Sequence, residues 1–267
     1  MAAPPDVQPV VPRAFVAGAT GYTGSHVVTV LAERGVDTIA HVRPDTAALE
    51  TWRTRFTTPA GDSTRGPVRI DTTPWSESAM TATLTAARPT MVFALLGTTR
   101  ARGRRARAGG AVDTYETVDY GLTMLLLRAA VASGRATGVW PRFVYLSVLG
   151  ASANSRFAYA AVRGRVEDEL RGSGLSYAIA RPTIITGDDR DESRPMERLT
   201  AVVMGASLGI LAAVGAGGLR DRYGSLSGEA LAKALVQLTL DPSHASVMAD
   251  AQELRRLAKG QGATGTK

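Results

Sequence analysis

Apolar segments of strand length alternate with longer helical segments along most of the chain. The shorter segments are rich in Val, Ile, Leu and Phe on both faces, which is typical of a sheet covered by helices on both sides. The alternation therefore predicts an α/β fold, a Rossmann-like doubly wound parallel sheet. We expect strands at residues 14–17, 37–42, 68–70, 90–96, 142–147 and 176–180. We expect helices at residues 25–34, 46–56, 77–87, 111–133, 155–171 and 228–240.

A glycine-rich turn follows the first expected strand and opens the first expected helix. Gly18 and Gly21 allow a tight turn and a close approach of the backbone to a ligand, and Gly24 lets the helix pack closely on the strand. The N-terminus of the helix offers N–H groups to a pyrophosphate. Because the turn lies between a strand and a helix, it predicts a dinucleotide-binding site. The expected contacts are Gly18, Thr20, Gly21, Tyr22, Thr23 and Gly24.

The end of the second expected strand predicts which dinucleotide binds. An acidic residue at this point hydrogen-bonds the ribose 2′-hydroxyl of NAD, but this chain has His41, Val42 and Arg43 there. The guanidinium of Arg43 offers a charge and a planar set of donors to a 2′-phosphate. The sequence therefore favours NADPH (NADP) as the cofactor. The alternatives are an Arg43 that is simply solvated and a role for the nearby Asp45.

Composition limits the chemistry that the side chains supply. The chain has no Cys and three widely spaced His, which excludes disulfides and thiol nucleophiles and argues against a bound metal. Its formal net charge of +7 favours anionic partners such as nucleotides. Chemistry must then come from hydroxyl groups, carboxylates, Arg or a bound cofactor.

Several segments resemble those of one known family. The chain is similar to the atypical short-chain dehydrogenase/reductases, and most of all to their Tat-interacting-protein oxidoreductase branch. The resemblance covers about residues 13–241 and implies a Rossmann-type fold, a bound NADPH and a reductase or redox-sensing activity. The segments that carry it are GATGYTG at 18–24, LGTTR at 96–100, VD at 118–119, YLS at 145–147, RP at 181–182 and ESRP at 192–195.

Ser147, Tyr159 and Arg163 form the catalytic set that the resemblance implies. In such reductases a Tyr gives its proton to the substrate carbonyl oxygen, a Ser hydrogen-bonds that oxygen, and a Lys four residues after the Tyr orients the nicotinamide ribose. Here Arg163 stands at the position of the Lys. It keeps a positive charge that eases ionisation of the Tyr and it offers donors to ribose hydroxyls, but its head is bulkier and flat. This departure leaves open whether the site catalyses a reaction.

The resemblance also implies cofactor contacts at the ends of later strands, where an open parallel sheet has its cleft. Those at strand ends are Leu96, Gly97, Thr98, Thr99 and Pro182, and the resemblance adds Arg163, in the helix expected at 155–171. Asp119 opens an apolar helix and is expected either near the cofactor or as a charge that complements the helix dipole.

The chain is long enough for one large domain, since 45% of its 267 residues are hydrophobic. We expect an extended leader at residues 1–12, which holds four Pro and shows no secretory or transit peptide pattern. The NAD(P)-binding Rossmann-like domain is expected at 13–241, with a small C-terminal substrate cap at about 183–227. A C-terminal helix and a flexible tail are expected at 242–267.

These features predict a cytoplasmic, NADPH-dependent oxidoreductase that reduces a small carbonyl-type substrate. The alternative is a non-catalytic NADPH-binding accessory subunit or redox sensor in a larger, mitochondrial membrane assembly. Arg163, the high pI and the uncharged segment 201–219 favour that alternative.

Two further segments bear on partners. Five Gly weaken segment 201–219 as a helix, so we expect it to be buried, or to contact a partner or a membrane surface, rather than to span a bilayer. Residues 100–107 hold five Arg and are expected to form a solvated loop or a lid over an anionic substrate. No aromatic residue lies between these Arg, which argues against nucleic-acid binding.

Overall fold

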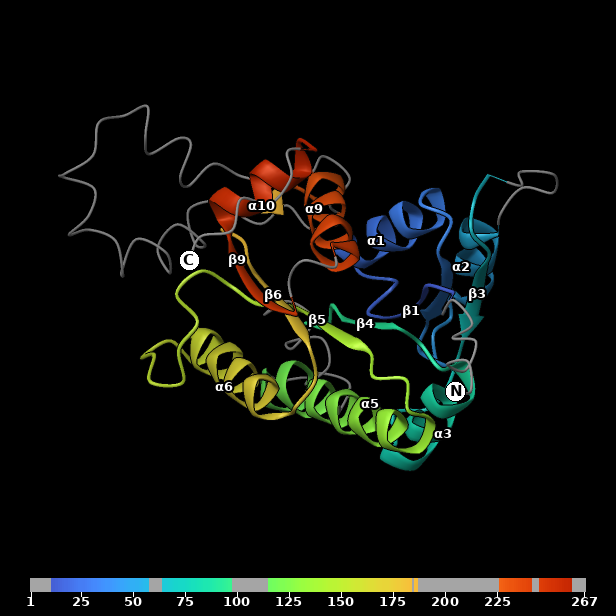
Figure 1. Ribbon diagram of the computed structural model, residues 1–267, viewed down its shortest axis with the longest axis horizontal. Coiled ribbons are helices and arrows are strands. Elements are labelled where there is room, and N and C mark those ends of the chain that lie inside the picture. The colour runs from blue at the N-terminus through green and yellow to red at the C-terminus, as the bar shows by residue number, and fades with distance from the viewer. Residues whose placement is uncertain are drawn as a thin grey trace, which may run out of the picture.

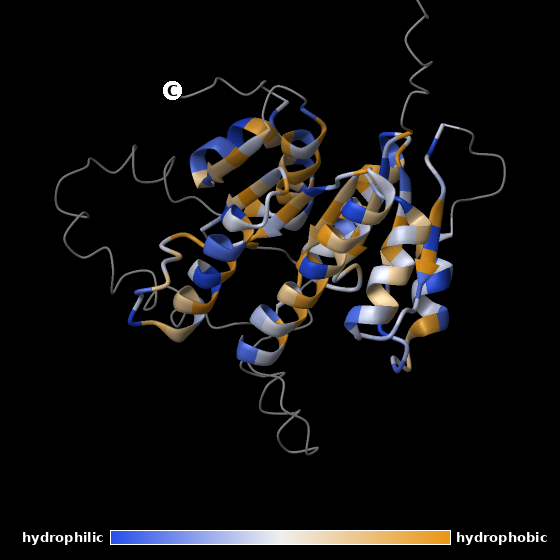
Figure 2. Cartoon of the chain, turned by 60° about the horizontal axis from the view of Figure 1, so that its bottom comes forward, coloured by the Kyte–Doolittle hydropathy of each residue, from blue (hydrophilic) through white to orange (hydrophobic). Residues whose placement is uncertain are grey.

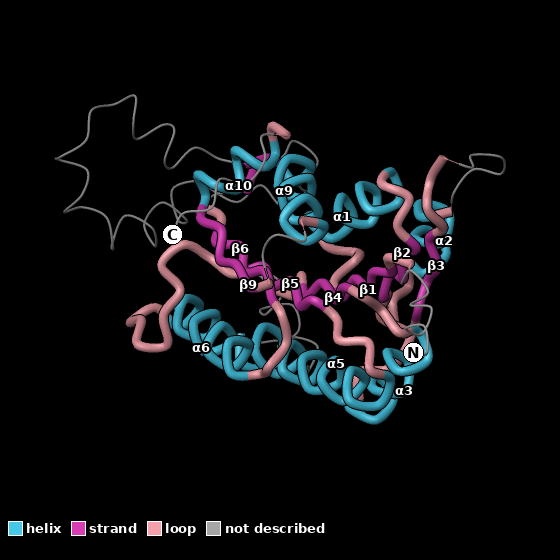
Figure 3. The backbone as a smooth tube through the Cα atoms, viewed as in Figure 1, coloured by secondary structure: helices cyan, strands magenta, loops and turns pink. Residues whose placement is uncertain are grey.

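In the described part of the chain, seven parallel strands form one continuous sheet in the computed structural model (Figure 1 and Figure 3). The structure describes residues 11–57, 64–97, 115–183, 185–186, 226–241 and 245–260. The strand order is β3-β2-β1-β4-β5-β6-β9, so the direction of winding reverses between β1 and β4. The strands are β1 (Arg13–Ala17), β2 (Asp37–His41), β3 (Val68–Asp71), β4 (Met91–Ala94), β5 (Arg142–Leu146), β6 (Tyr177–Arg181) and β9 (Ser246–Asp250).

Helices cover both faces of the sheet. Figure 1 shows α3, α5 and α6 on one face and α1, α9 and α10 on the other. The helices are α1 (Tyr22–Glu33), α2 (Leu49–Phe56), α3 (Glu77–Ala87), α5 (Thr123–Thr137), α6 (Ala158–Gly172), α9 (Gly228–Leu240) and α10 (Ala251–Ala258), and a π-helix, η1 (Tyr115–Leu122), precedes α5. This arrangement confirms the predicted α/β, Rossmann-like doubly wound fold.

Each face of the sheet has its own apolar core. Within β1 the side chains alternate, because successive residues of a strand point to opposite faces. Ala14 and Val16 pack beneath α1 and α9, whereas Phe15 and Ala17 pack against α3 and α5. Figure 2 shows strands that are largely hydrophobic and helices that carry both hydrophobic and hydrophilic residues. The unbroken apolar runs of the sequence therefore reflect burial on both sides.

The described helices begin near the expected residues, with two informative differences. α9 begins at Gly228 as expected, because the Ser227 hydroxyl accepts a hydrogen bond from Ala230 N at 3.1 Å. α1 begins at Tyr22, three residues before its expected start, since the glycine turn leads directly into it. In its described part, the expected helix at 111–133 is divided into η1 and α5. A π-helix widens the turn and is common at functional sites.

The sheet continues past residue 241, the expected end of the Rossmann-like domain. β9 pairs in parallel with β6, and α10 follows it directly. The expectation of only a helix and a tail at 242–267 therefore missed a strand of the sheet. β9 lies at the edge, and among its five residues only Ala249 is buried. Such an exposed strand lacks the apolar run that marks a covered one.

Several expected features lie outside the described residues. They are most of the leader, the Arg-rich residues 100–107, segment 201–219 and residues 261–267. At the two ends of the expected cap, β7 (Ile185–Thr186) pairs in parallel with β8 (Leu226–Ser227). None of the helices in the described part of the chain is both long and apolar enough to cross a membrane.

Candidate active site

The glycine-rich turn joins β1 to α1 at the carboxyl edge of the sheet. Gly18 has a φ of +85°, and a Cβ atom there would lie 2.6 Å from the carbonyl oxygen of Leu95. A Cβ atom at Gly24 would overlap the carbonyl oxygen of Gly18. The N–H of Gly21 donates to the same oxygen at 2.9 Å and closes the turn. The geometry therefore requires glycine at both ends of the turn.

The start of α1 fits a pyrophosphate group. Gly21 precedes the helix in an extended conformation, and no side chain caps the helix start. The first N–H groups of a helix have no partner inside it, and they attract anions. Thr23 is buried, and Thr20 and Tyr22 are half-buried. A helix start of this kind, next to a glycine-rich turn, has the backbone donors that a diphosphate requires.

Tyr22 also ties α1 to α9. Its hydroxyl accepts a hydrogen bond from the N–H of Gly228 at 3.3 Å. A Cβ atom at Gly228 would lie 2.5 Å from the Tyr22 ring, so the two helices approach closely here. The ring of His26 lies edge-on to the Tyr22 ring, with 5.4 Å between centroids. The expected contact of Tyr22 with the cofactor stays a prediction.

The register of the sheet brings the other expected residues to the same edge as the turn. Ala17 of β1 pairs with the last residue of β2 and with Ala94 of β4, and Ala94 pairs with Tyr145 of β5. The chain therefore leaves neighbouring strands at one level. The expected residues that follow these strands and β6 are Gly18, Arg43, Leu96, Gly97, Ser147 and Pro182. Thr98 and Thr99 lie outside the described residues.

His41 supports the backbone two residues before the exposed Arg43. It is buried at the end of β2, with its ring 5.8 Å from that of Phe15 and 4.8 Å from that of Trp75. Its Nε2–H donates to the carbonyl oxygen of Thr73 at 2.8 Å. Burial lowers the pKa of His41 from 6.5, although the hydrogen bond to Thr73 and the charge of Asp71 act in the opposite direction. His41 is therefore neutral at pH 7.

Acid should destabilise the chain through His41. Because its pKa is lower in the folded chain, the unfolded chain binds the proton first as the pH falls. The stability that neutral His41 contributes is therefore present above pH 6.5 and is lost below it. Urea unfolding between about pH 7.5 and pH 4.5 should show a smaller decline for His41→Phe than for the wild type. His26→Gln controls for loss of a histidine, and parallel curves for wild type and His41→Phe would contradict the prediction.

Arg163 is buried on α6 and bonded to three other parts of the fold. Its Nη1 donates to the Tyr145 hydroxyl at 3.2 Å and to the carbonyl oxygen of Leu146 at 2.8 Å. Its Nη2 donates to the carbonyl oxygen of Leu96 at 3.0 Å and to Asp119 Oδ1 at 2.5 Å. These bonds use all four Nη hydrogens, and Nε has no partner among the described residues. The expected donation to a ribose would have to replace one of them.

The partner of Arg163 on η1 is the fully buried Asp119. Asp119 is therefore half of a buried ion pair and not an exposed charge at a helix start. Burial alone would lower the pKa of Arg163, but electrostatic interactions with the oxygens of Tyr159, Tyr145 and Asp119 outweigh burial and raise that pKa. Burial raises the pKa of the Tyr145 hydroxyl to about 12, against the opposing effect of Arg163. Arg163 thus stays charged and Tyr145 stays protonated at neutral pH.

Tyr159 lies one helical turn before Arg163 and is half-buried. The Cζ atom of Arg163 is 5.1 Å from the centre of the Tyr159 ring. The ring of Tyr115, from η1, lies 5.1 Å from that of Tyr159. The structure thus brings Tyr159 and Arg163 together, and their catalytic roles stay a prediction. A cation this close to the ring interacts favourably with its π electrons.

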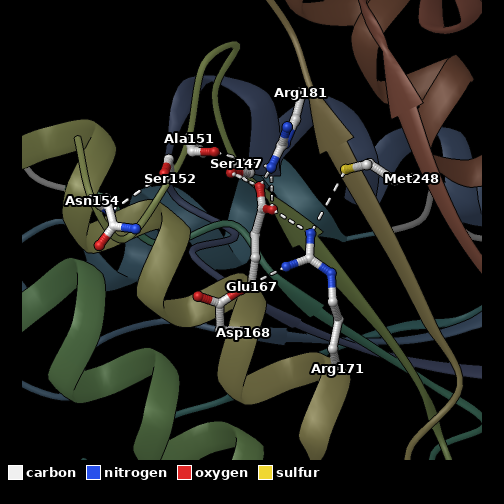
Figure 4. Close-up of polar contacts among 9 residues, drawn as sticks. All are labelled: Ser147, Ala151, Ser152, Asn154, Glu167, Asp168, Arg171, Arg181 and Met248. Carbon is white, nitrogen blue, oxygen red and sulfur yellow. Dashed lines mark hydrogen bonds and ion pairs between the residues drawn. The ribbon is translucent and has the colours of Figure 1, made fainter.

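Ser147 is buried beyond the end of β5, and its hydroxyl donates to Oε1 of Glu167 at 2.6 Å (Figure 4). Glu167 is fully buried on α6. Its carboxylate also accepts from Arg181, through Nε at 2.9 Å and Nη2 at 2.5 Å, and from Arg171 Nη2 at 2.8 Å. In Figure 4 this carboxylate lies between the serine and the two guanidinium groups. Sequence reasoning named Ser147 but not Glu167.

A family model with the description NAD(P)H-binding matches residues 18–242 of the chain. The chain belongs to this NAD(P)H-binding family. The curated relatives that bear the name "Protein fmp52, mitochondrial" include two from Aspergillus species. The one from Aspergillus clavatus is 31% identical over 244 residues, which cover 89% of this chain and 91% of the relative. The one from Aspergillus fumigatus is 34% identical over 193 residues, which cover 70% of this chain and 72% of the relative.

Solved structures share the fold of this NAD(P)H-binding chain. UDP-glucose 4-epimerase from Brucella ovis, in complex with NAD, superposes with a TM-score of 0.58 at 17% identity, over 90% of this chain and 77% of that one. An oxidoreductase of the short-chain dehydrogenase/reductase family from Burkholderia thailandensis gives a TM-score of 0.57 at 16% identity, over 92% and 93% of the two chains. These likenesses agree with the Rossmann-like architecture.

One helix of this NAD(P)H-binding chain carries a pattern that sequence reasoning overlooked. Tyr159, Arg163 and Glu167 are spaced four residues apart, and such residues share one face of a helix. In the structure that face of α6 meets the ends of β4 and β5. The spacing was therefore a signal for Glu167. The partnership of Glu167 with Arg181 had no such signal, because the fold alone brings α6 to the end of β6.

Proposed function

We propose that this chain is an NADPH-dependent oxidoreductase that reduces a small carbonyl-type substrate. The main support for the proposal is that the glycine turn and the Tyr159–Arg163 pair lie at the same edge of the sheet. Arg163 bonds to the carbonyl oxygens of Leu96 and Leu146, at the ends of β4 and β5, and the turn follows the neighbouring β1. Open α/β folds bind their ligands at this edge, next to the point where the winding reverses. Membership of the NAD(P)H-binding family supports the cofactor class.

Each residue of the site has one task in this proposal. NADPH, when bound, would supply a hydride to the carbonyl carbon of the substrate. Tyr159 gives its hydroxyl proton to the carbonyl oxygen of the substrate, and the charge of Arg163 stabilises the phenolate that remains. Ser147 lies at the same oxygen. The turn at Gly18 binds the pyrophosphate through backbone N–H groups, and Arg43 binds the 2′-phosphate.

Replacing Arg43 by alanine tests the cofactor preference. Arg43 is exposed beyond β2, so its loss leaves the core unchanged. We expect the Kd for NADPH, from titration of intrinsic fluorescence, to rise about 10- to 100-fold, as for the loss of a charge-assisted hydrogen bond, while the Kd for NADH stays the same. Arg34→Ala, at the other end of α1, removes the same charge and should change neither constant. An equal effect of Arg43→Ala on both nucleotides would reject the preference for NADPH.

Replacing Tyr159 by phenylalanine tests catalysis. The ring stays over Arg163, and only the proton donor is lost. With NADPH and a panel of small aldehydes, ketones and enones, we expect turnover to fall at least about 100-fold while NADPH binding persists. Tyr177→Phe serves as the control, because it also removes a tyrosine hydroxyl but lies at the start of β6, away from the carboxyl edge of the sheet. Full activity in Tyr159→Phe would remove this residue from the mechanism.

A second candidate is a non-catalytic NADPH-binding accessory subunit or redox sensor. Two observations favour it: the Nη hydrogens of Arg163 are all bonded within the protein, and the Ser147 hydroxyl is bonded to Glu167. Nucleotide retained through purification, no turnover with the panel and elution within a large complex would support this role. The names of the relatives support a mitochondrial location in place of the cytoplasmic one that the sequence suggested.

A further inference from the structure

The carboxylate of Glu167 meets a donor at each of its four lone-pair positions (Figure 4). Oε1 accepts from the Ser147 hydroxyl and from Arg181 Nε, and Oε2 accepts from Arg181 Nη2 and Arg171 Nη2. An ionised carboxylate has about four such positions and no proton to give. The side chain of Glu167 has no exposed surface, so water does not compete for these positions. Its oxygens are thus fully occupied as acceptors.

The Ser147 hydroxyl has one proton, which it donates to Glu167 in a hydrogen bond. A hydroxyl group offers one donor and two acceptor positions. Because Glu167 only accepts, the 2.6 Å contact between the two side chains has to contain the Ser147 proton. The backbone N–H of Ser147 is also engaged, by the carbonyl oxygen of Ala180 at 2.8 Å. A further group that meets Ser147 Oγ must therefore bring its own proton.

The support for Glu167 comes from several elements. Arg181, at the end of β6, binds it with two nitrogens and also donates to the carbonyl oxygen of Ala151 at 3.0 Å. Ala151 belongs to the segment between β5 and α6 that follows Ser147. Arg171 adds a bond from one turn further along α6. The orientation of the carboxylate is thus fixed by two cations and does not depend on Ser147.

We infer that Glu167 is a positioning residue that fixes Ser147 as a hydrogen-bond acceptor, so that Ser147 recognises a hydroxyl group and not a carbonyl group. The inference rests on the proposed function, which places Ser147 at the substrate oxygen. A carbonyl oxygen has no proton to offer Ser147, whereas an alcohol has one. Ser147 therefore binds the alcohol member of a carbonyl–alcohol pair through the hydroxyl proton of the alcohol, which turns from Ser147 to the Tyr159 oxygen when the alcohol is oxidised. Tyr159 alone donates to the carbonyl member.

Neutron diffraction on crystals of the perdeuterated full-length chain tests the first part directly and needs no variant. We expect the deuteron of Ser147 to lie between Oγ and Oε1 of Glu167, and neither carboxylate oxygen to carry one. A Ser147 deuteron that points away from Glu167, or a deuteron on Glu167, would overturn the inference.

Ser147→Ala tests the consequence for ligands, with the carbonyl–alcohol pair that the substrate panel identifies. Because the variant loses an acceptor, we expect the KM for the alcohol with NADP to rise about 5-fold, and the KM for the carbonyl with NADPH to stay within about 2-fold. Glu167→Gln should change the ratio of the two KM values in the same direction, since the serine proton is no longer held. Glu169→Gln, two residues along the same helix, should leave the ratio unchanged. A merely structural role would raise both KM values alike, which would refute the inference.

Absence of turnover in the wild type would reject the proposed enzyme function and not the assignment of the Ser147 proton. The neutron map would then decide alone whether Glu167 holds that proton. A map with the proton on the far side of Ser147, together with normal turnover, would reject the inference and leave the enzyme function standing.

Discussion

Gly24→Ala should abolish NADPH binding and lower the free energy of unfolding by about 2–3 kcal/mol. A Cβ atom at this position would overlap the carbonyl oxygen of Gly18 and lie 2.8 Å from the carbonyl carbon. Both atoms belong to the backbone of the turn, so no side chain can move aside to make room. The start of α1 has to shift away from β1, and the N–H groups that we assign to the pyrophosphate shift with it. Urea unfolding and fluorescence titration with NADPH measure the two effects.

Gly172→Ala is the matched control for that substitution. Gly172 is the last residue of α6, and a Cβ atom there meets nothing within 4 Å. Since alanine favours helices more than glycine, we expect its stability to be unchanged or higher by up to about 1 kcal/mol, with normal nucleotide binding. Normal NADPH affinity in Gly24→Ala would show that the turn is not the pyrophosphate site.

Asp119→Ala should lower the free energy of unfolding by about 3–5 kcal/mol, the range measured when a buried ion pair loses one partner. Asp119 is fully buried, and the Arg163 side chain that it neutralises is 4% exposed. Without the carboxylate, the guanidinium is a buried charge that keeps only carbonyl and hydroxyl partners. The double variant Asp119→Leu with Arg163→Met removes both charges, and we expect it to recover most of the lost stability.

A second ion pair between the same two elements serves as the control. Arg165 of α6 binds Glu116 of η1 through two contacts, at 2.9 and 3.1 Å, but their side chains are 40% and 59% exposed. Because water solvates both partners, Glu116→Ala should change stability by less than about 1 kcal/mol. Equal losses of unfolding free energy for Asp119→Ala and Glu116→Ala would mean that burial does not increase the cost of breaking the Arg163 pair.

Local patterns in the sequence were sufficient to predict most of the fold. Strands such as β1 and β5 are buried on both faces, so their apolar runs are visible in the sequence, and the glycines of the first turn have a conformational reason that sequence spacing reveals. The serine that begins α9 is equally local, since its hydroxyl bonds a residue three positions later. In each case the structure depends on neighbours along the chain.

The missed features depend on partners that are remote in sequence. β9 has one buried residue, and only its register with β6 makes it part of the sheet. The four partners of Arg163 are between 17 and 67 residues away, so sequence reasoning expected a free guanidinium for the ribose. Glu167 was overlooked for a similar reason, because its main cation, Arg181, lies at the end of β6 and not on the same helix. Spacing on one helix indicates a shared face, but not what that face will meet.

The contact between α1 and α9 has a consequence for protein synthesis. Tyr22 and Gly228 are 206 positions apart, and β9 is made later still. Ribosomes release a polypeptide from its N-terminus, so α1 leaves the exit tunnel long before α9 exists to cover it. During that interval the apolar side of α1 lacks its native cover. The nascent polypeptide thus supplies the partner of Tyr22 only near the end of translation, although Tyr22 and the glycine-rich turn before it are among the first residues to be joined.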